Sequence, residues 1–378
     1  MPKSLYWFLP LLLVCAWTSV ALSDEISDQL KALASGNESE VEKALDYLSK
    51  QSVDPDKQSE VAKALNQLDK GGNHELAEPA LLVWATSDNV PLIIRILESK
   101  KFDRGNLLDL AAKMKDDRFL LPLVNILKDT HDDGKKAEAV LAGWGKSASP
   151  IILQQINHPD DEAHSRLVRL WEQRKLDKDA RTLQSVIDLG AKDKQTRQYA
   201  GEWLAQQKTI SDSTRKQATE FALNALKDAK GTDALDLTEI IAKFGHESFR
   251  DDYVKMIESK DFHQWHAGLH GVILSGDVRC AKTLIERMKN EEFAGQVSKI
   301  MTRHGAKSET LALALLKQPI DAPRGLAHLS VCMILGEVGT KKSVSALNQL
   351  ANKKTVSDNL RNAAKVSAAE ISSRKGAR

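Results

Sequence analysis

Residues 335–371, LGEVGTKKSVSALNQLANKKTVSDNLRNAAKVSAAEI, contain the pattern that decides the fold. Leu335 and Gly336 close one apolar segment, Gly339 begins a turn, and two segments follow with apolar residues at three- and four-residue steps. This spacing predicts two helices that each bury one face. The joint between the helices is only a few residues long, so we expect them to run antiparallel.

A joint followed by an apolar helix returns along the chain at a period of about 30 residues. Four of these joints begin at Gly245, Gly276, Gly305 and Gly339, which are 31, 29 and 34 residues apart. Upstream, prolines open the corresponding helices, and proline suits the first helical turn; they are Pro91, Pro122 and Pro150. Two helices cannot bury their apolar faces alone, so such units must stack. The predicted fold class is all-α, an α-α superhelix of antiparallel helix pairs.

These motifs resemble HEAT repeats of the short type that is also seen in bilin lyases. The resemblance covers the chain from about residue 74 to residue 372 and is clearest in the last four units. It implies a HEAT-like solenoid, whose second helices form the concave layer. The Asp and Arg residues that lock successive HEAT repeats are mostly missing, so we expect an irregular twist. HEAT repeats specify architecture and are nearly silent about function.

The first 23 residues, MPKSLYWFLPLLLVCAWTSVALS, have the layout of a secretory signal peptide. Lys3 precedes an apolar segment, and the small residues Ala21 and Ser23 come just before Asp24. We expect cleavage after Ser23; a lipoprotein signal at Cys15 and an uncleaved anchor are the alternatives. Residues 24–73 are then expected to form an N-terminal helical cap and residues 74–378 the repeat solenoid. The mature protein is predicted to be extracytoplasmic, either periplasmic or secreted.

Charge and cysteine content narrow the possible partners. Removal of residues 1–23 takes away one of the 54 Lys and Arg side chains and none of the 52 Asp and Glu side chains. A nearly neutral, exported chain is not expected to bind nucleic acid, and no second apolar run is long enough to span a membrane. Cys280 and Cys332 remain after cleavage, and the sequence leaves their pairing open.

The segment DFHQWHAGLH, residues 261–270, is a candidate metal site because its histidines are spaced by three and four residues. On a helix His263, His266 and His270 share one face, and imidazoles suit zinc, copper and nickel. Asp261 is the predicted N-cap. The preferred interpretation is nevertheless a row of packing histidines at the edge of a buried stripe. Metal binding by the three histidines is the alternative.

Two arguments from the repeat support the packing interpretation. The helix precedes the turn at Gly276, so it is expected to be the first helix of its unit and to lie in the outer layer. Ala267-Gly268 also aligns with Ala200-Gly201, and this alignment would place His270 at the position that Trp203 occupies.

Other candidate sites fail on spacing. Deoxyhypusine hydroxylase, a HEAT-like enzyme, holds iron with four His-Glu pairs, whereas here the pairs are His74-Glu75 and His246-Glu247. Residues 129–140 imitate a calcium loop, but Val140 stands where a bidentate Glu is needed. Asp160 or Asp161 is expected to cap a helix. The tryptophans at repeat spacing are expected to pack in the core; they are Trp84, Trp144, Trp171 and Trp203.

No catalytic motif is recognised, so the sequence favours a protein that is not an enzyme and uses no cofactor. We expect a scaffold whose concave layer binds a protein or peptide partner. The helices expected to form that layer begin near Pro91, Pro122, Pro150, Gly276, Gly305 and Gly339. Polar residues on them are the candidate contacts: Arg95, Asn125, Gln154 and Gln155.

Overall fold

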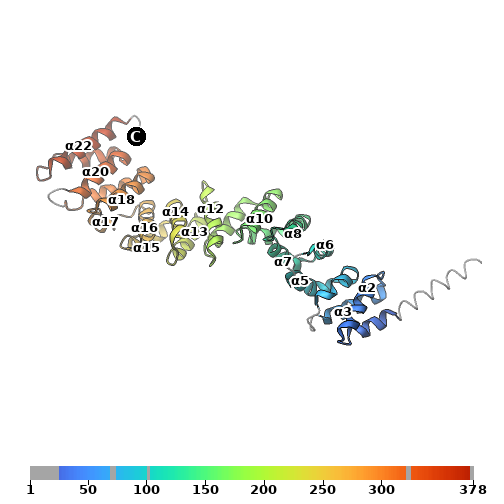
Figure 1. The fold of residues 1–378 in the computed structure, drawn as a ribbon. Coiled ribbons are helices and arrows are strands. Elements are labelled where there is room, and N and C mark those ends of the chain that lie inside the picture. Colours follow the sequence, from blue (N-terminus) through green and yellow to red (C-terminus); the bar gives the residue numbers. More distant parts are fainter. Residues whose placement is uncertain (1–24, 69–73, 100–102, 321–324, 375–378) are drawn as a thin grey trace, which may run out of the picture. The chain divides into compact units, whose positions relative to one another are not determined.

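The computed structural model describes residues 25–68, 74–99, 103–320 and 325–374. Within these ranges every regular element is a helix, and no helix there is long and apolar enough to cross a bilayer (Figure 1). The predicted signal peptide and its alternatives concern residues 1–23, which lie outside the described residues.

The chain forms two compact units, Met1–Asp177 and Lys178–Arg378. The sequence predicts a single solenoid from residue 74 onward and does not anticipate this division. The predicted cap, residues 24–73, contributes its apolar residues to the same core as the helices that follow it. The α-helices of the first unit are α2 (Glu38–Ser49), α3 (Pro55–Gln67), α4 (Glu78–Trp84), α5 (Val90–Ser99), α6 (Gly105–Met114), α7 (Leu120–Ile126), α8 (Asp132–Gly143), α9 (Ser149–Gln154) and α10 (Asp161–Gln173).

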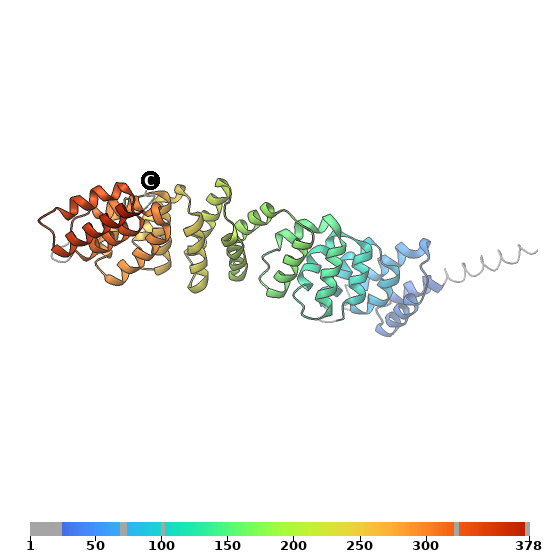
Figure 2. The ribbon, with the colours of Figure 1, turned by 90° about the horizontal axis from the view of Figure 1, so that it is seen from above.

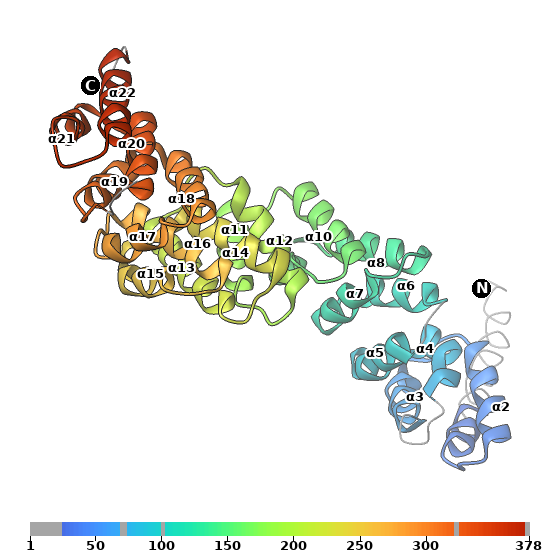
Figure 3. The same cartoon turned by 60° about the vertical axis from the view of Figure 1, so that its left-hand side comes forward.

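The second unit has two layers of α-helices. In Figure 3, α13, α15, α17 and α19 lie along one side and α14, α16, α18 and α20 along the other. Seen from above, the helices of each unit stack side by side (Figure 2). The α-helices of this unit are α11 (Lys178–Asp188), α12 (Lys194–Gln206), α13 (Asp212–Leu226), α14 (Gly231–Phe244), α15 (Arg250–Ile257), α16 (Phe262–Ser275), α17 (Ala281–Arg287), α18 (Glu291–His304), α19 (Glu309–Leu316), α20 (Leu326–Val338), α21 (Lys341–Ala351) and α22 (Asp358–Ser373).

Side-chain caps fix where many helices begin. The carboxylate of Asp261 accepts a hydrogen bond from the backbone N–H of Gln264, which confirms the predicted N-cap of α16. Asp160 caps α10 in the same way, so the first of the two predicted candidates is correct. Each such bond satisfies a backbone N–H that has no partner within the helix.

The helices pair with different neighbours from those predicted, because the observed pairs are shifted by one helix along the chain. α16 packs along α15, and not along α17 as the turn at Gly276 suggests. Two glycines permit this contact: a Cβ atom at Gly271 would lie 2.2 Å from the ring of Tyr253, and one at Gly268 would lie 2.8 Å from the Cβ of Met256. α16 is therefore the second helix of its pair. Likewise, α7 pairs with α8, α19 with α20 and α21 with α22.

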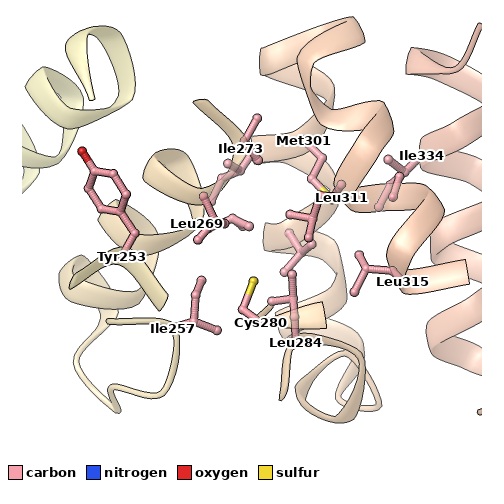
Figure 4. Close-up of a cluster of buried hydrophobic side chains, with 14 of the residues drawn as sticks. Tyr253, Ile257, Leu269, Ile273, Cys280, Leu284, Met301, Leu311, Leu315 and Ile334 are labelled. Carbon is pink, nitrogen blue, oxygen red and sulfur yellow. The ribbon is translucent and has the colours of Figure 1, made fainter. Parts of the chain in front are cut away.

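Each unit has its own hydrophobic core. Figure 4 shows part of the core of the second unit, where Leu269 and Ile273 of α16 lie between Tyr253 on one side and Met301 and Leu311 on the other. Cys280 belongs to this core and does not pair with Cys332, which is also buried and free. Burial raises the pKa of both thiols to about 12.

The predicted packing role of the tryptophans is confirmed most clearly at Trp84 and Trp144, which are buried in the first unit. Nε1 of Trp84 donates a hydrogen bond of 2.8 Å to the carbonyl of Leu48, so the indole joins α4 to α2. Trp171 and Trp203 are half-buried and pack against their cores.

At two joints Arg and Asp side chains tie successive pairs together, although the sequence predicts that such contacts are mostly missing. Arg197 of α12 forms an ion pair with Asp233 of α14, and both side chains are largely buried. Arg104 forms an ion pair with Asp129 and its backbone N–H donates to Asp133. Asp129 and Asp133 belong to the acidic segment at residues 129–140 that imitates a calcium loop. These contacts give that segment a structural role.

Candidate functional site

Four histidines form a cluster on the layer of second helices. We define the histidine cluster as His263, His266 and His270 of α16 together with His304 of α18. Nδ1 of His270 lies 2.7 Å from Nε2 of His304, and one ring donates to the other. His270 is only 2% exposed. The structure thus adds His304, 34 residues further along the chain, to the row that the sequence predicts.

An ion pair closes over this cluster. Glu239 of α14 and Arg303 of α18 form a two-bond contact, with Nη1 donating to Oε1 at 2.7 Å. These two residues belong to helices on opposite sides of α16, so the ion pair passes across it. The ion pair therefore links α14 to α18 across α16, within the layer of second helices. The sequence predicts α16 as a first helix, and this part of the prediction is wrong, because α16 is the second helix of its pair.

Burial lowers the pKa of three histidines of this cluster, His266, His270 and His304, and so favours their neutral form. Desolvation lowers the pKa of His266 to about 4, and the neighbouring charge of His263 adds to the effect. Desolvation, followed by the charges of His304 and Arg303, lowers the pKa of His270 to about 3. The pKa of His304 falls to about 4 because of burial and then of Arg303 and Lys307, while Glu239 acts in the opposite direction. Glu239 and Arg303 form a charged pair beside these three rings.

The buried histidines predict a loss of stability in weak acid. The pKa of His270 falls from 6.5 in the unfolded chain to about 3 in the folded one. The unfolded chain therefore binds a proton first as the pH falls below 6.5, so stability decreases there. Between pH 7.5 and pH 5, His270 should account for about 2 kcal/mol of the loss. Urea unfolding at both pH values should show a correspondingly smaller loss in His270→Gln.

The exposed His131 of the first unit provides the control for this prediction. The variant His131→Gln should keep the pH dependence of the wild type. Equal pH dependence in the wild type and His270→Gln would show that His270 is not buried in neutral form.

The cluster does not have the geometry of a metal centre. The ring centroids of His266 and His270 are 6.3 Å apart, and His270 already uses one nitrogen to contact His304. Among the described residues, no group of three or more His, Cys, Asp or Glu side chains is placed to hold a metal ion. Nδ1 of His263 and Nε2 of His266 are buried without a hydrogen-bond partner. Two nitrogens of the proposed metal site thus lack a hydrogen-bond partner, but among the described residues no third ligand is placed beside them.

The helix caps correct the predicted register of His270. Asp193 caps α12 and Asp261 caps α16, and alignment of these two caps places Trp203 opposite Gly271 instead of His270. The side chains agree with this alignment. Trp203 donates a hydrogen bond to Thr182 of its partner helix α11, and Gly271 makes room for Tyr253 of its partner helix α15. His270 instead faces the neighbouring pair.

A pocket of about 330 Å³ opens beside the cluster, at the start of α16 and α18. We call it the aromatic pocket. Its residues are Phe262, Trp265, Arg287, Asn290, Glu292, Phe293 and Gln296. The rings of Trp265 and Phe293 are 4.5 Å apart, and Phe262 meets Trp265 edge-on at 5.7 Å. Phe262 is 45% exposed, and among the described residues it is the aromatic member of the exposed large hydrophobic side chains.

Arg287 is held rigidly against the rings of this pocket. Its guanidinium carbon lies 4.3 Å from the centroid of Phe293 and 5.5 Å from that of Trp265. Its Nη1 donates to the carbonyl oxygens of Ile257 and Ser259. Burial lowers the pKa of Arg287 from its usual value. The stacked guanidinium and the two carbonyl contacts leave this side chain little rotational freedom.

The predicted contact residues lie in the other unit, on α5, α7 and the end of α9. Arg95, Asn125 and Gln154 are exposed, and Gln155 is half-buried. α7 contacts both α5 and α9, so the structure brings these residues onto one layer. Because α7 and α9 pair with α8 and α10, this is the layer of first helices and not of second helices. Their role in binding stays a prediction.

The second predicted His-Glu pair is engaged in the structure of the fold. Nδ1 of His246 accepts from the backbone N–H of Ser248, and Nε2 lies 3.3 Å from Asp212. Glu247 forms an ion pair with Arg215 at 3.3 Å. Both side chains thus tie the start of α15 to α13.

Neither a family model nor a curated protein matches this chain. Among solved structures, the crystal structure of the archaeal HEAT-like repeats protein from Thermococcus onnurineus NA1 is similar at 14% sequence identity and a TM-score of 0.27. The match covers 74% of this chain and 96% of that one. A likeness this weak carries no argument, so the assignment rests on the helices described above. They define an all-α solenoid of stacked antiparallel helix pairs, and the predicted fold class is confirmed.

Proposed function

We propose that the protein is an exported, non-enzymatic repeat scaffold that binds a protein or peptide partner through the aromatic pocket. The observation that carries this proposal is the exposed ring of Phe262 beside Trp265, Phe293 and the fixed guanidinium of Arg287. Aromatic and Arg side chains supply most of the binding energy in protein interfaces. A repeat scaffold without a recognised catalytic group offers such a surface for binding and not for chemistry.

Rigidity favours this pocket over the polar surface of α5, α7 and α9. Ring contacts hold Trp265 and Phe293, and two backbone carbonyls hold Arg287, so little side-chain entropy is lost on binding. Exposed side chains such as Asn125 and Gln154 must be immobilised when a partner binds. We therefore assign the main contact to the aromatic pocket and leave Arg95, Asn125, Gln154 and Gln155 as a second, weaker surface.

The rim of the pocket defines the chemistry of the partner. Glu292 lies on the rim in the first turn of α18, next to Glu291, so this first turn presents two exposed carboxylates. Gln296 offers an amide that suits the backbone of an extended segment. We expect a segment that inserts an apolar or aromatic side chain between the rings and places a Lys or Arg near Glu292.

Replacing Phe262 by alanine tests this proposal, because the exposed ring contributes little to the core. The tagged mature protein is used to capture partners from the native exported fraction, and captured material is compared between variants. Phe262→Ala should weaken binding of the specific partner by at least about tenfold, which is the effect of a moderate hot spot.

Val366 of α22 provides a matched control because it is 49% exposed and lies outside the pocket. Val366→Ala should retain the partner at the wild-type level. Equal capture of the partner by Phe262→Ala and Val366→Ala would show that the aromatic pocket is not the binding site. Detection of the mature chain only in the cytoplasmic fraction would remove export.

A further inference from the structure

A second pocket, of about 340 Å³, lies between α13 and α15 in the layer of first helices. We call it the polarised pocket. Its residues are Glu220, Leu223, Asn224, Leu226, Lys227, Phe249, Asp252, Lys255, Met256 and Gln264. The labels of Figure 3 show α13 and α15 as neighbours on the side of the unit opposite to α14. The pocket shares no lining residue with the histidine cluster or the aromatic pocket, although Gln264 of α16 contributes to it.

Two contacts fix how α13 and α15 are aligned. Arg215 in the first turn of α13 forms an ion pair with Glu247, which precedes α15. One turn further along α13, the hydroxyl of Thr219 lies near the hydroxyl of Tyr253, in the middle of α15. The sequence thus advances along both helices in the same direction. The next residue of α13, Glu220, lies at the level of Asp252 and Tyr253.

This alignment separates the charges of the pocket by sign. Glu220 and Asp252 lie toward one end, whereas Lys227 and Lys255 lie toward the C-terminal ends of the two helices. Seven residues separate Glu220 from Lys227, which corresponds to about 10 Å along the helix axis. The macrodipole of α15 accounts for an acid in its first turn and a lysine in its last turn. It does not account for Glu220, which lies in the middle of α13.

The four charges are available to a ligand. Within the described residues none of them takes part in an ion pair, although most other exposed Asp and Arg side chains near this pocket do. Lys227 donates one hydrogen bond to Asn224 at 3.0 Å and keeps two N–H donors. All four side chains are exposed at the rim.

The floor between the two charged ends is apolar. Leu223 is 8% exposed and Leu226 is 2% exposed, and Phe249 and Met256 are half-buried. A flexible methionine can adjust to side chains of different shapes. The volume falls at the lower end of the range for sites that bind small molecules.

We propose that the polarised pocket binds a short zwitterionic peptide of two or three residues with an apolar side chain. The ammonium group of the peptide lies between Glu220 and Asp252, and its carboxylate lies between Lys227 and Lys255. The apolar side chain covers Leu223, Leu226, Phe249 and Met256. Two or three extended residues span about 7 to 10 Å, which matches the separation of Glu220 and Lys227 along α13. On α15, Asp252 and Lys255 are closer, about 4.5 Å apart along the helix axis. A free amino acid is too short to reach from Glu220 to Lys227.

Titration calorimetry on the full mature chain with the dipeptide Ala-Phe tests this proposal. Ala-Phe should bind saturably, and its N-acetylated and C-amidated forms should each bind at least about fivefold more weakly, because each lacks one charge. Free phenylalanine should also bind more weakly. Equal binding of the capped and free forms would overturn the proposal, as would the absence of saturable binding at about 10 mM Ala-Phe.

Charge variants assign each end of the peptide. Lys255→Gln should weaken the binding of Ala-Phe and leave the affinity for its C-amidated form unchanged. Glu220→Gln should also weaken the binding of Ala-Phe and should leave the affinity for its N-acetylated form unchanged. Lys216→Gln, at an exposed position of α13 outside the pocket, should have no effect. Phe262→Ala should not alter Ala-Phe binding, so the two proposals can fail separately. Near-UV circular dichroism of each variant confirms the fold, and an unchanged affinity in both Lys255→Gln and Glu220→Gln contradicts the assigned site.

Discussion

Replacement of Trp84 by alanine is expected to lower the free energy of unfolding by about 3 to 5 kcal/mol, one of the largest effects of any single substitution in this chain. Trp84 is fully buried in the core of the first unit. Its removal leaves a cavity and also leaves the carbonyl of Leu48 without the 2.8 Å hydrogen bond from Nε1. Urea denaturation followed by far-UV circular dichroism measures the loss.

Two variants separate the contributions at this position. Trp84→Phe keeps most of the apolar volume and removes the donor, so it should cost less than alanine. Leu121→Ala on α7, where the side chain is 49% exposed, should change the free energy of unfolding by less than about 0.5 kcal/mol. A loss below about 1 kcal/mol for Trp84→Ala would contradict the packing of α4 against α2.

Gly271→Val is expected to lower the free energy of unfolding by about 3 kcal/mol, at the upper end of the range for overpacked cores. A Cβ atom at this position would meet the ring of Tyr253 at 2.2 Å, so α15 and α16 would have to separate. A larger residue at a helical glycine normally gains propensity, and that gain is small beside this clash. Calorimetric unfolding of the full chain measures the change.

Gly295 in the middle of α18 provides the control for Gly271→Val. No atom lies within 4 Å of a Cβ built there. Gly295→Ala should therefore raise stability by up to about 1 kcal/mol, because alanine is the better helix former. Tyr253→Leu should recover part of the loss when combined with Gly271→Val, since it frees the space that the valine needs. A stable Gly271→Val variant without this second change would show that α16 does not pair with α15.

The helices themselves were predictable from sequence because their signals are local. Apolar periodicity and caps such as Asp160 and Asp261 lie within a few residues of the structure that they determine. The pairing was not predictable from the same signals. Every connection in the stack is short, so Gly276 could mark either kind of joint. Whether α16 pairs with α15 or with α17 depends on the contact between Gly271 and Tyr253, which are far apart in the sequence pattern and adjacent in the folded chain.

The same distinction explains the candidate sites. The row of His263, His266 and His270 follows from helix geometry, but His304 and the ion pair between Glu239 and Arg303 come from other helices. The aromatic pocket needs three helices to form. By helical spacing Phe262 and Trp265 fall on the apolar stripe of α16, and only the 45% exposure of Phe262 indicates that it is available to a partner. An aromatic residue at the first position of a helix, where burial is incomplete, was the one available signal.

The division into two units has a consequence for the predicted contacts. Arg95, Asn125 and Gln154 belong to the first unit, whereas the histidine cluster and both pockets belong to the second. Each unit has a separate core, so substitutions at the pockets should leave the first unit intact. Any loss of structure in a pocket variant should therefore be confined to the second unit.

The affinity of the purified partner for the wild type and for Phe262→Ala tests the central claim most directly. Titration calorimetry with both proteins at equal, verified fold content should give a dissociation constant at least about tenfold higher for Phe262→Ala, with Val366→Ala unchanged. Identical dissociation constants for the wild type and Phe262→Ala would contradict the claim that this scaffold binds its partner through the aromatic pocket.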